Sequence, residues 1–434
     1  MLALLKQRNF FIFWLGELIS VIGDHISIIA FPWLVLQMTG SPAMTGLVLA
    51  AQGLPRAILM LWGGAFVDRS SPRMVMIVTD IVRFGLMLGL GLLILDGSIT
   101  LPIIFIGAAL FGIADAFFYP ATTSILPSLL KKEELQQGNA IVQMTTHTAV
   151  IFGPVIAGLL IMGDFAMPDT HAGTGSEEAN FATDRIGLAR AFIVDAATFG
   201  ISIFTLLFIK TRSLRDEENA EEKSSMIDDI IVALKHVWSI PALRLCFIGI
   251  AVLEFFFQAP IFVGLPVLMK IRFADGALVY GMILGCYGLG ALIGSGFSGS
   301  IKQFQAESIP RAMFLVFAWS GLTLGLMVLF PAYQVAMVLF FLAGFGDNFM
   351  WVQFSTWLQQ TTPDHLMGRV MSILMFLALG LLPIANMTMG FLFEIALEET
   401  LIVASAAMVL ICGFTAFHKD IKLVTAKTVT PEVL

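Results

Sequence analysis

The chain has 434 residues, of which 58% are hydrophobic and 13% charged, and its mean hydropathy is +0.90. A soluble globular protein is nearer half apolar and a quarter charged, so this composition argues against a soluble domain and predicts a membrane protein. The net charge is −7 and the basic residues form no continuous patch, so we expect no nucleic-acid partner. The three cysteines lie far apart in apolar runs, which predicts neither a disulfide framework nor a zinc site.

The N-terminal apolar run extends from Phe10 to Leu36, which is too long for the apolar part of a signal peptide. It also carries Glu17 and Asp24 and lacks a small-residue cleavage site. We therefore interpret it as a retained first transmembrane helix.

Apolar runs of about 20 residues predict transmembrane helices, and the chain holds twelve. Their approximate ranges are 10–37, 43–67, 74–95, 101–123, 137–163, 188–209, 243–269, 277–300, 310–330, 334–358, 368–393 and 399–418. With the N-terminus inside, eighteen Lys and Arg residues fall on the inner side and four on the outer side. The positive-inside rule then predicts that both termini are cytoplasmic.

Two longer loops interrupt the pattern. The loop at 210–241 is a predicted cytoplasmic linker. It separates a six-helix bundle at 1–209 from a second bundle at 242–420, which is followed by a tail at 421–434. In the linker, Met226, Ile230, Leu234 and Val237 share one helical stripe after Ser225, which favours a surface amphipathic helix over a plain solvated linker. The outer loop at 164–185 is acidic, and we expect a loosely packed connector there.

Charges are concentrated in "GGAFVDRSSPR" (63–73), between the second and third spans. The positions Gly64, Asp68, Arg69 and Arg73 resemble the signature loop of the major facilitator superfamily. A second stretch in the fifth span, "GPVIAGLLIMG", is similar to the glycine-proline motif of antiporters in that superfamily. It supplies Gly153, Pro154 and Gly158.

Further matches at 191–199, 287–294 and 363–372 extend the resemblance over almost the whole chain. The best fit is the bacterial branch that contains drug, macrolide and siderophore exporters. Residues 122–144 are weakly similar to residues 353–376, as two homologous halves of the chain would be. The resemblance implies an all-α membrane protein with twelve transmembrane helices in two pseudo-symmetric six-helix bundles around a central cavity. Gly281, Gly285, Gly290 and Gly294 predict a close-packing helix face.

In the resembled fold, Asp68 faces a helix N-terminus of the other half, where a carboxylate is stabilised by about 0.3–1 kcal/mol. Arg69 and Arg73 can pair with neighbouring acids, including Asp80. We call Gly64, Asp68, Arg69, Arg73 and Asp80 the cytoplasmic latch, since such a cluster closes one side of a transporter. The alternative is that the two arginines only obey the positive-inside rule.

Ionisable groups inside a bilayer cost about 2.5–3.5 kcal/mol or more and usually face a cavity or a partner. Asp24, Asp115, Glu254 and Asp347 lie midway along spans 1, 4, 7 and 10, which line the cavity of the resembled fold. Glu17 lies seven residues before Asp24 on the same face and offers a path toward the cytoplasm. Desolvation disfavours a charged carboxyl, so these acids can exchange protons for a cationic or polar substrate.

Arg56 lies at mid-depth in span 2, and we expect it to pair with Asp24 or Asp115, in which case the paired acid is structural. Many proton antiporters of the superfamily carry an arginine in span 4, whereas this chain has none there. Aromatic and methionine side chains near the acids suit lipophilic cargo, unless they only pack or face lipid. They are Tyr119, Phe255, Phe256, Phe257, Met350, Trp351 and Trp357.

The resemblance implies a monomeric, multi-pass transporter of the cell membrane that is not an enzyme and needs no cofactor or metal. Its partners are a small lipophilic substrate, protons and the lipid bilayer. We expect proton-coupled export of lipophilic or amphiphilic compounds by alternating access. Export of a siderophore or lipid-like metabolite is the nearest alternative. A non-transporting receptor or scaffold is another, although it would not need four acids at mid-membrane.

Overall fold

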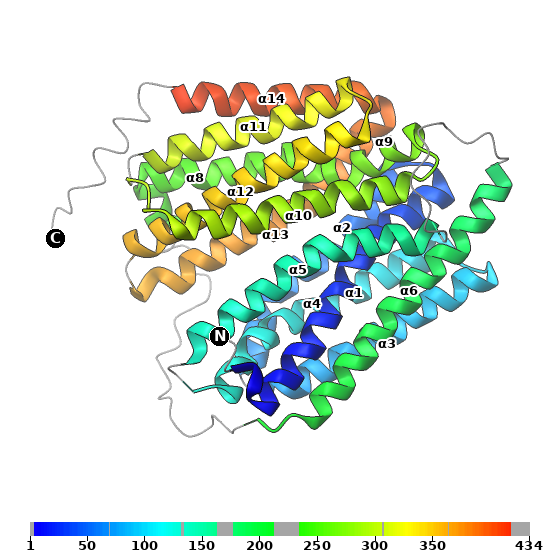
Figure 1. The fold of residues 1–434 in the computed structure, drawn as a ribbon, viewed down its shortest axis with the longest axis horizontal. Helices are drawn as coiled ribbons and strands as arrows, with labels where there is room; N and C mark the ends of the chain where they lie inside the picture. Colours follow the sequence, from blue (N-terminus) through cyan, green and yellow to red (C-terminus); the bar gives the residue numbers. More distant parts are fainter. Residues whose placement is uncertain are drawn as a thin grey trace. The chain divides into compact units, whose positions relative to one another are not determined.

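The computed structural model describes residues 4–68, 70–131, 134–162, 177–211, 234–305, 308–362 and 364–417. Within these ranges the chain is helical and contains no strand (Figure 1). Twelve helical segments are long and apolar enough to cross a membrane, which confirms the predicted number of spans. The chain is therefore a multi-pass, all-α membrane protein. It divides into two compact units.

The first unit comprises Met1–Glu218 and Leu265–Gly285. Its helices are α1 (Arg8–Thr39), α2 (Pro42–Asp68), α3 (Pro72–Asp96), α4 (Leu101–Leu129), α5 (Leu135–Met162), α6 (Glu177–Phe208), α9 (Leu265–Arg272) and the first part of α10 (Gly276–Ser300), after a single 3₁₀ turn at Leu4–Lys6. Two of these helices end at a glycine in the left-handed conformation, Gly40 after α1 with φ 64° and Gly97 after α3 with φ 78°. Glycine has no Cβ and therefore takes positive φ at little cost.

Packing in this unit pairs α2 with α4, α3 with α6, and α1 with both α5 and α6. The antiporter-like glycines of α5 make close contacts with neighbouring helices. A Cβ added to Gly158 would lie 2.7 Å from the Cα of Leu278, and one added to Gly153 would meet His25 on α1. The carbonyl of Pro154 faces Gly281 of α10, where an added Cβ would clash. These contacts leave no room for a side chain at the glycines.

The second unit comprises Asn219–Gly264 and Cys286–Leu434. It contains α8 (Pro241–Leu253), the rest of α10, α11 (Ile309–Leu329), α12 (Tyr333–Thr361), α13 (Asp364–Ile395) and α14 (Leu397–Phe417). α11 packs against α12 and α14. On α10, Gly290 and Gly294 face the carbonyls of Phe341 and Phe345 on α12, so this part of the predicted glycine face is also close-packed. Leu265–Gly285 belongs to the first unit, and the division at 209 and 242 stays a prediction.

The seventh span runs from Pro241 to Arg272 and is not a plain α-helix. Two π-helical turns, η3 (Glu254–Gln258) and η4 (Pro260–Gly264), separate α8 from α9. Pro260 has no backbone N–H, so regular α-helical bonding is interrupted around it. Wider turns of this kind are frequent at functional sites, and the first of them begins at a predicted site residue, Glu254.

Two loop predictions have different outcomes. α6 begins at Glu177, inside the acidic stretch predicted as a connector, so that prediction is wrong for residues 177–185. Residues 164–176 lie outside the described part. In the linker, residues 234–239 are helical, with Leu234 exposed and Val237 buried. Ser225, Met226 and Ile230 lie outside the described residues.

Candidate functional site: a buried charge network and an acidic cavity

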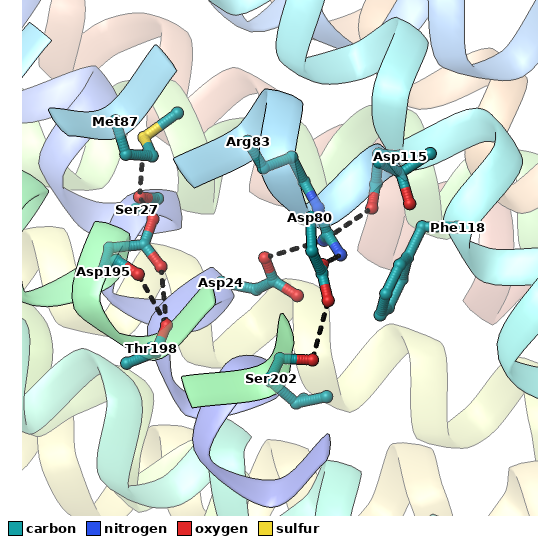
Figure 2. A network of polar contacts seen from close by, with 12 residues as sticks. Asp24, Ser27, Asp80, Arg83, Met87, Asp115, Phe118, Asp195, Thr198 and Ser202 are labelled. Atoms are coloured by element: carbon teal, nitrogen blue, oxygen red, sulfur yellow. Dashed lines mark hydrogen bonds and ion pairs between the residues drawn. The ribbon is translucent and has the colours of Figure 1, made fainter. Parts of the chain in front are cut away.

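Arg83 is the centre of a polar network inside the first unit (Figure 2). Its side chain is completely buried and contacts carboxylates from three helices. One guanidinium nitrogen lies 2.5 Å from Asp80, one turn earlier on α3. The other lies 3.4 Å from Asp24 on α1 and 3.7 Å from Asp115 on α4. A buried arginine needs such partners to offset the loss of hydration.

Two aromatic rings enclose the same guanidinium. Its central carbon lies 3.7 Å from the ring centroid of Phe118 on α4 and 4.4 Å from that of Phe199 on α6. The negative faces of the rings add a favourable electrostatic contact and exclude water. Side chains from α1, α3, α4 and α6 therefore hold the Arg83 guanidinium in place together.

Arg56 makes the ion pair predicted for it. Its guanidinium donates to the Asp115 carboxylate at 3.0 Å, and both side chains are partly exposed. Asp115 thus lies between Arg56 of α2 and Arg83 of α3. A carboxylate shared by two guanidinium groups is electrostatically compensated, which agrees with a structural role for this acid.

The structure corrects one part of the latch prediction. Asp80 is fully buried, and its second oxygen accepts a hydrogen bond from Ser202 at 2.7 Å. Arg73 does not reach it and instead donates to the carbonyls of Leu206 and Leu207 at the end of α6, at 2.8 and 2.9 Å. Asp80 belongs to the Arg83 network because Arg83 lies one turn deeper on the same helix. Arg69 and the side chain of Asp68 lie outside the described residues; of Gly64 only the helical backbone is described.

Two further acids adjoin the network. Glu17 on α1 is buried, and among the described residues its Oε2 has no hydrogen-bond partner. Asp195 on α6 is fully buried and accepts a hydrogen bond from Ser27 of α1 (Figure 2). Asp195 was not among the predicted site residues.

The second unit contains a cavity of about 210 Å³. Its lining comes from α8, η3, α10, α11, α12 and α13: Ile250, Leu253, Glu254, Gln258, Tyr287, Met313, Phe317, Asp347, Asn348, Met350, Trp351, Phe354 and Ala378. Asp347 accepts hydrogen bonds from Ser320 at 2.7 Å and from Tyr287 at 3.1 Å. No Lys, Arg or His belongs to this lining. The cavity is therefore apolar and aromatic, with two carboxyls and no basic counter-ion in its wall.

The structure brings the predicted acids together in pairs, Asp24 with Asp115 around Arg83 and Glu254 with Asp347 in the cavity. Of the predicted aromatic residues, Trp351 lines the cavity, whereas Phe256 is half-buried against Phe255 outside its lining. Tyr119 on α4 is 54% exposed and takes no part in the network.

Sequence reasoning missed Arg83, Asp195, Tyr287 and Ser320 as site residues. Asp80 and Arg83 carried a usable signal, because acid and base three residues apart share one helix face. Tyr287 and Ser320 carried none, since only tertiary packing brings them to Asp347. Within the described residues, no group of three His, Cys, Asp or Glu side chains could hold a metal ion.

Comparisons with known proteins agree with this architecture. The multidrug efflux pump Tap of Mycobacterium tuberculosis (strain ATCC 25618 / H37Rv) is 26% identical over 418 residues, covering 94% of this chain and 92% of the pump. The enterobactin exporter EntS of Citrobacter koseri is 24% identical over 378 residues, covering 85% and 82%. The solved structure of a bacterial homologue of the human lysosomal transporter Spinster, inward-facing and unoccupied, shares the fold with a TM-score of 0.68, 12% identity and 99% coverage of both chains.

The family model described as Major Facilitator Superfamily matches residues 13–386, which includes the Arg83 network and the acidic cavity. The exporter-branch resemblance carried by the loop at 63–73 and the α5 glycines is confirmed by these relatives. The chain therefore belongs to the Major Facilitator Superfamily and is a multi-pass membrane transporter whose relatives include efflux pumps.

Proposed function

We propose that this protein is a secondary exporter of lipophilic cations and related amphiphilic compounds, driven by protons through alternating access. The observation that carries the proposal is the composition of the cavity wall in the second unit. Glu254 and Asp347 are its two ionisable acids, and its lining contains no basic residue. A bound cation would supply the missing positive charge.

The rest of the lining fits a bulky apolar body. Phe317, Trp351 and Phe354 offer aromatic surfaces, and Met313 and Met350 offer flexible, polarisable ones. Aromatic faces attract cations, and methionine adapts to ligands of different shape. The combination supports a range of lipophilic substrates rather than one small polar solute.

Proton coupling is supported by the charge balance of the first unit. Two guanidinium groups, Arg56 and Arg83, share one region with five acids: Glu17, Asp24, Asp80, Asp115 and Asp195. Burying a carboxylate without a counter-ion costs roughly several kcal/mol of free energy. The acids in excess of the two guanidinium groups are therefore more stable when they carry a proton. A transporter that gains and loses these protons can exchange them for cargo.

The proposed transporter also has a defined orientation, a cytoplasmic latch and two moving halves. The termini lie in the cytoplasm, by the placement of Lys and Arg. Asp68, Arg69 and Arg73 close the cytoplasmic side as a latch, without Asp80. The six-helix bundles at 1–209 and 242–420 are the moving halves, and the protein acts as a monomer without cofactor or enzymatic activity.

The enterobactin exporter among the relatives favours a second candidate cargo, a siderophore or lipid-like metabolite. The two candidates differ in charge, because a cavity that selects a cation should bind an uncharged metabolite less tightly.

Purified protein in proteoliposomes with an imposed pH gradient tests the proposal. The panel comprises ethidium as a lipophilic cation, erythromycin as a macrolide, and an uncharged lipid-like compound. We expect gradient-dependent movement of ethidium that collapses when a protonophore dissipates the gradient. Movement of the uncharged compound alone would favour the second candidate, and movement of none under any gradient would contradict both.

A further inference from the structure

A continuous polar surface lies buried between α1 and α6. On α1 its members are Glu17, Ser20, Asp24 and Ser27, and on α6 they are Asp195, Thr198, Ser202 and Thr205. Each set is spaced by three, four and three residues, which places it along one helix face. We call these eight residues the α1–α6 seam. All except Asp24 are buried in the described structure.

Glycines let the two helices approach along the seam. A Cβ added to Gly16 would lie 3.0 Å from the Cβ of Thr205, and one added to Gly23 would lie 3.0 Å from the Cβ of Thr198. Ser27 reaches Asp195 at the other end. The helices are therefore antiparallel along the seam. Ten residues of α-helix at 1.5 Å per residue make the seam about 15 Å long, roughly half of the hydrocarbon thickness of a bilayer.

The contacts at the Asp195 end allow the carboxyl either to accept from Ser27 or, when it is protonated, to donate to Ser27. The Ser27 hydroxyl has one hydrogen and two neighbours, Asp195 Oδ2 and the sulfur of Met87 at 3.7 Å. A thioether can only accept. If the serine donates to Met87, Asp195 must donate to the serine, and it can do so only when protonated. No ion pair of the described residues includes Asp195.

The opposite end of the seam has unused hydrogen-bonding capacity. Glu17 Oε2 and Ser20 Oγ are buried without a partner among the described residues, although buried polar groups are normally bonded. The charged groups that interact with the seam acids are Asp80, Arg83 and Asp115. Ionisable residues such as Glu17 inside membrane helices commonly mark ion or proton paths.

We propose that the α1–α6 seam is a proton pathway within the first unit, with Glu17 and Asp195 as proton-binding carboxyls at its ends and Asp24 as the acid between them. In one transfer, the proton of Asp195 moves along the seam to the Asp24 carboxylate, three residues before Ser27 on α1. Asp195 becomes charged and Asp24 neutral, so one proton has moved. Asp24 is the accessible member, with a side chain 23% exposed, and it is also 3.4 Å from Arg83. This inference rests on the proposed proton-driven export.

The experiment compares wild type with Asp195→Asn and Glu17→Gln, which keep side-chain shape but cannot lose a proton. Ser20→Ala tests the path between the ends, with Ser128→Ala as its matched control, because Ser128 is a buried serine of α4 that donates only to its own helix, at Ile125 O. Ethidium binding, proton release on ethidium addition in weak buffer, and gradient-driven ethidium movement are measured for each. Infrared spectra record the carbonyl band of protonated carboxyls.

We expect Asp195→Asn and Glu17→Gln to bind ethidium as the wild type does, to lose proton release and gradient-driven movement, and to lose part of the protonated-carboxyl band. Ser20→Ala should move protons more slowly than Ser128→Ala. Wild-type proton release in both acid variants would overturn the pathway. If the wild type itself shows no gradient-driven movement, the proposed function fails. In that case the infrared spectrum still tests the seam by itself. An unchanged carbonyl band of protonated carboxyls in Asp195→Asn would overturn the seam as a proton pathway as well.

Discussion

Arg83 and Asp80 form a fully buried ion pair one helical turn apart on α3, with 2.5 Å between guanidinium nitrogen and carboxylate oxygen. Removing only the arginine would leave Asp80 and Asp24 without their counter-ion. Breaking a buried pair in this way costs about 3–5 kcal/mol. We therefore predict that Arg83→Gln lowers the folded yield and the thermal midpoint in detergent.

Arg311→Gln serves as the control, because Arg311 contacts only the ring of Phe417 among its described interactions, at 5.4 Å. The double variant Asp80→Asn with Arg83→Gln should recover part of the loss, since it removes both charges. Equal thermal midpoints for Arg83→Gln and Arg311→Gln would contradict the central position of Arg83.

Asp115 should differ from the other mid-membrane acids. It is shared by Arg56 at 3.0 Å and Arg83 at 3.7 Å, and its side chain is partly exposed. Partly exposed ion pairs contribute about 0–1 kcal/mol, so Asp115→Asn should be only mildly destabilised. We predict that it keeps proton release on ethidium addition. A loss of proton release at full ethidium binding would instead make Asp115 a coupling residue.

The contact between α5 and α10 predicts the behaviour of Gly158→Leu. A Cβ at Gly158 would already lie 2.7 Å from the Cα of Leu278, so a leucine must push the helices apart. Overpacking of this kind costs about 1–3 kcal/mol. The variant should lose transport, and cysteine-accessibility labelling should show that one side no longer opens. Gly89→Leu is the control, because nothing lies within 4 Å of a Cβ at that position on α3.

The fold could be predicted from the sequence because the length of each apolar run and the placement of Lys and Arg determine membrane spans. Neither depends much on tertiary contacts. The pairing of Arg56 with one of two mid-membrane acids could likewise be predicted, and the structure selects Asp115. Asp80 was misassigned because depth along a helix does not tell which neighbour a side chain meets. Tyr287 and Ser320 could not be found at all, since ordinary span residues become hydrogen-bond donors to Asp347 only through packing.

The latch prediction concerns Asp68 and is independent of the buried network. Asp68→Asn removes charge with little change in volume. If this carboxylate closes the cytoplasmic side through a helix N-terminus, an interaction of about 0.3–1 kcal/mol or more is lost. We expect slower ethidium export from cells at a normal amount of membrane protein. Unchanged export would leave the positive-inside rule as the reason for the charges in this loop.

Glu254 provides the sharpest test of cargo recognition. Asp347 already accepts hydrogen bonds from Ser320 and Tyr287, so Glu254 is the cavity acid better placed to meet a cation. It also begins the π-helical turn of the seventh span.

Glu254→Gln keeps the side chain's size and removes its charge. We predict that ethidium binding weakens by at least about tenfold, which corresponds to about 1.4 kcal/mol, while an uncharged ligand of similar shape binds as before. Glu399→Gln, an exposed acid in the first turn of α14, is the matched control. If Glu254→Gln and Glu399→Gln bind ethidium equally well, the cation does not pair with Glu254, and Asp347 becomes the candidate to examine by the same comparison.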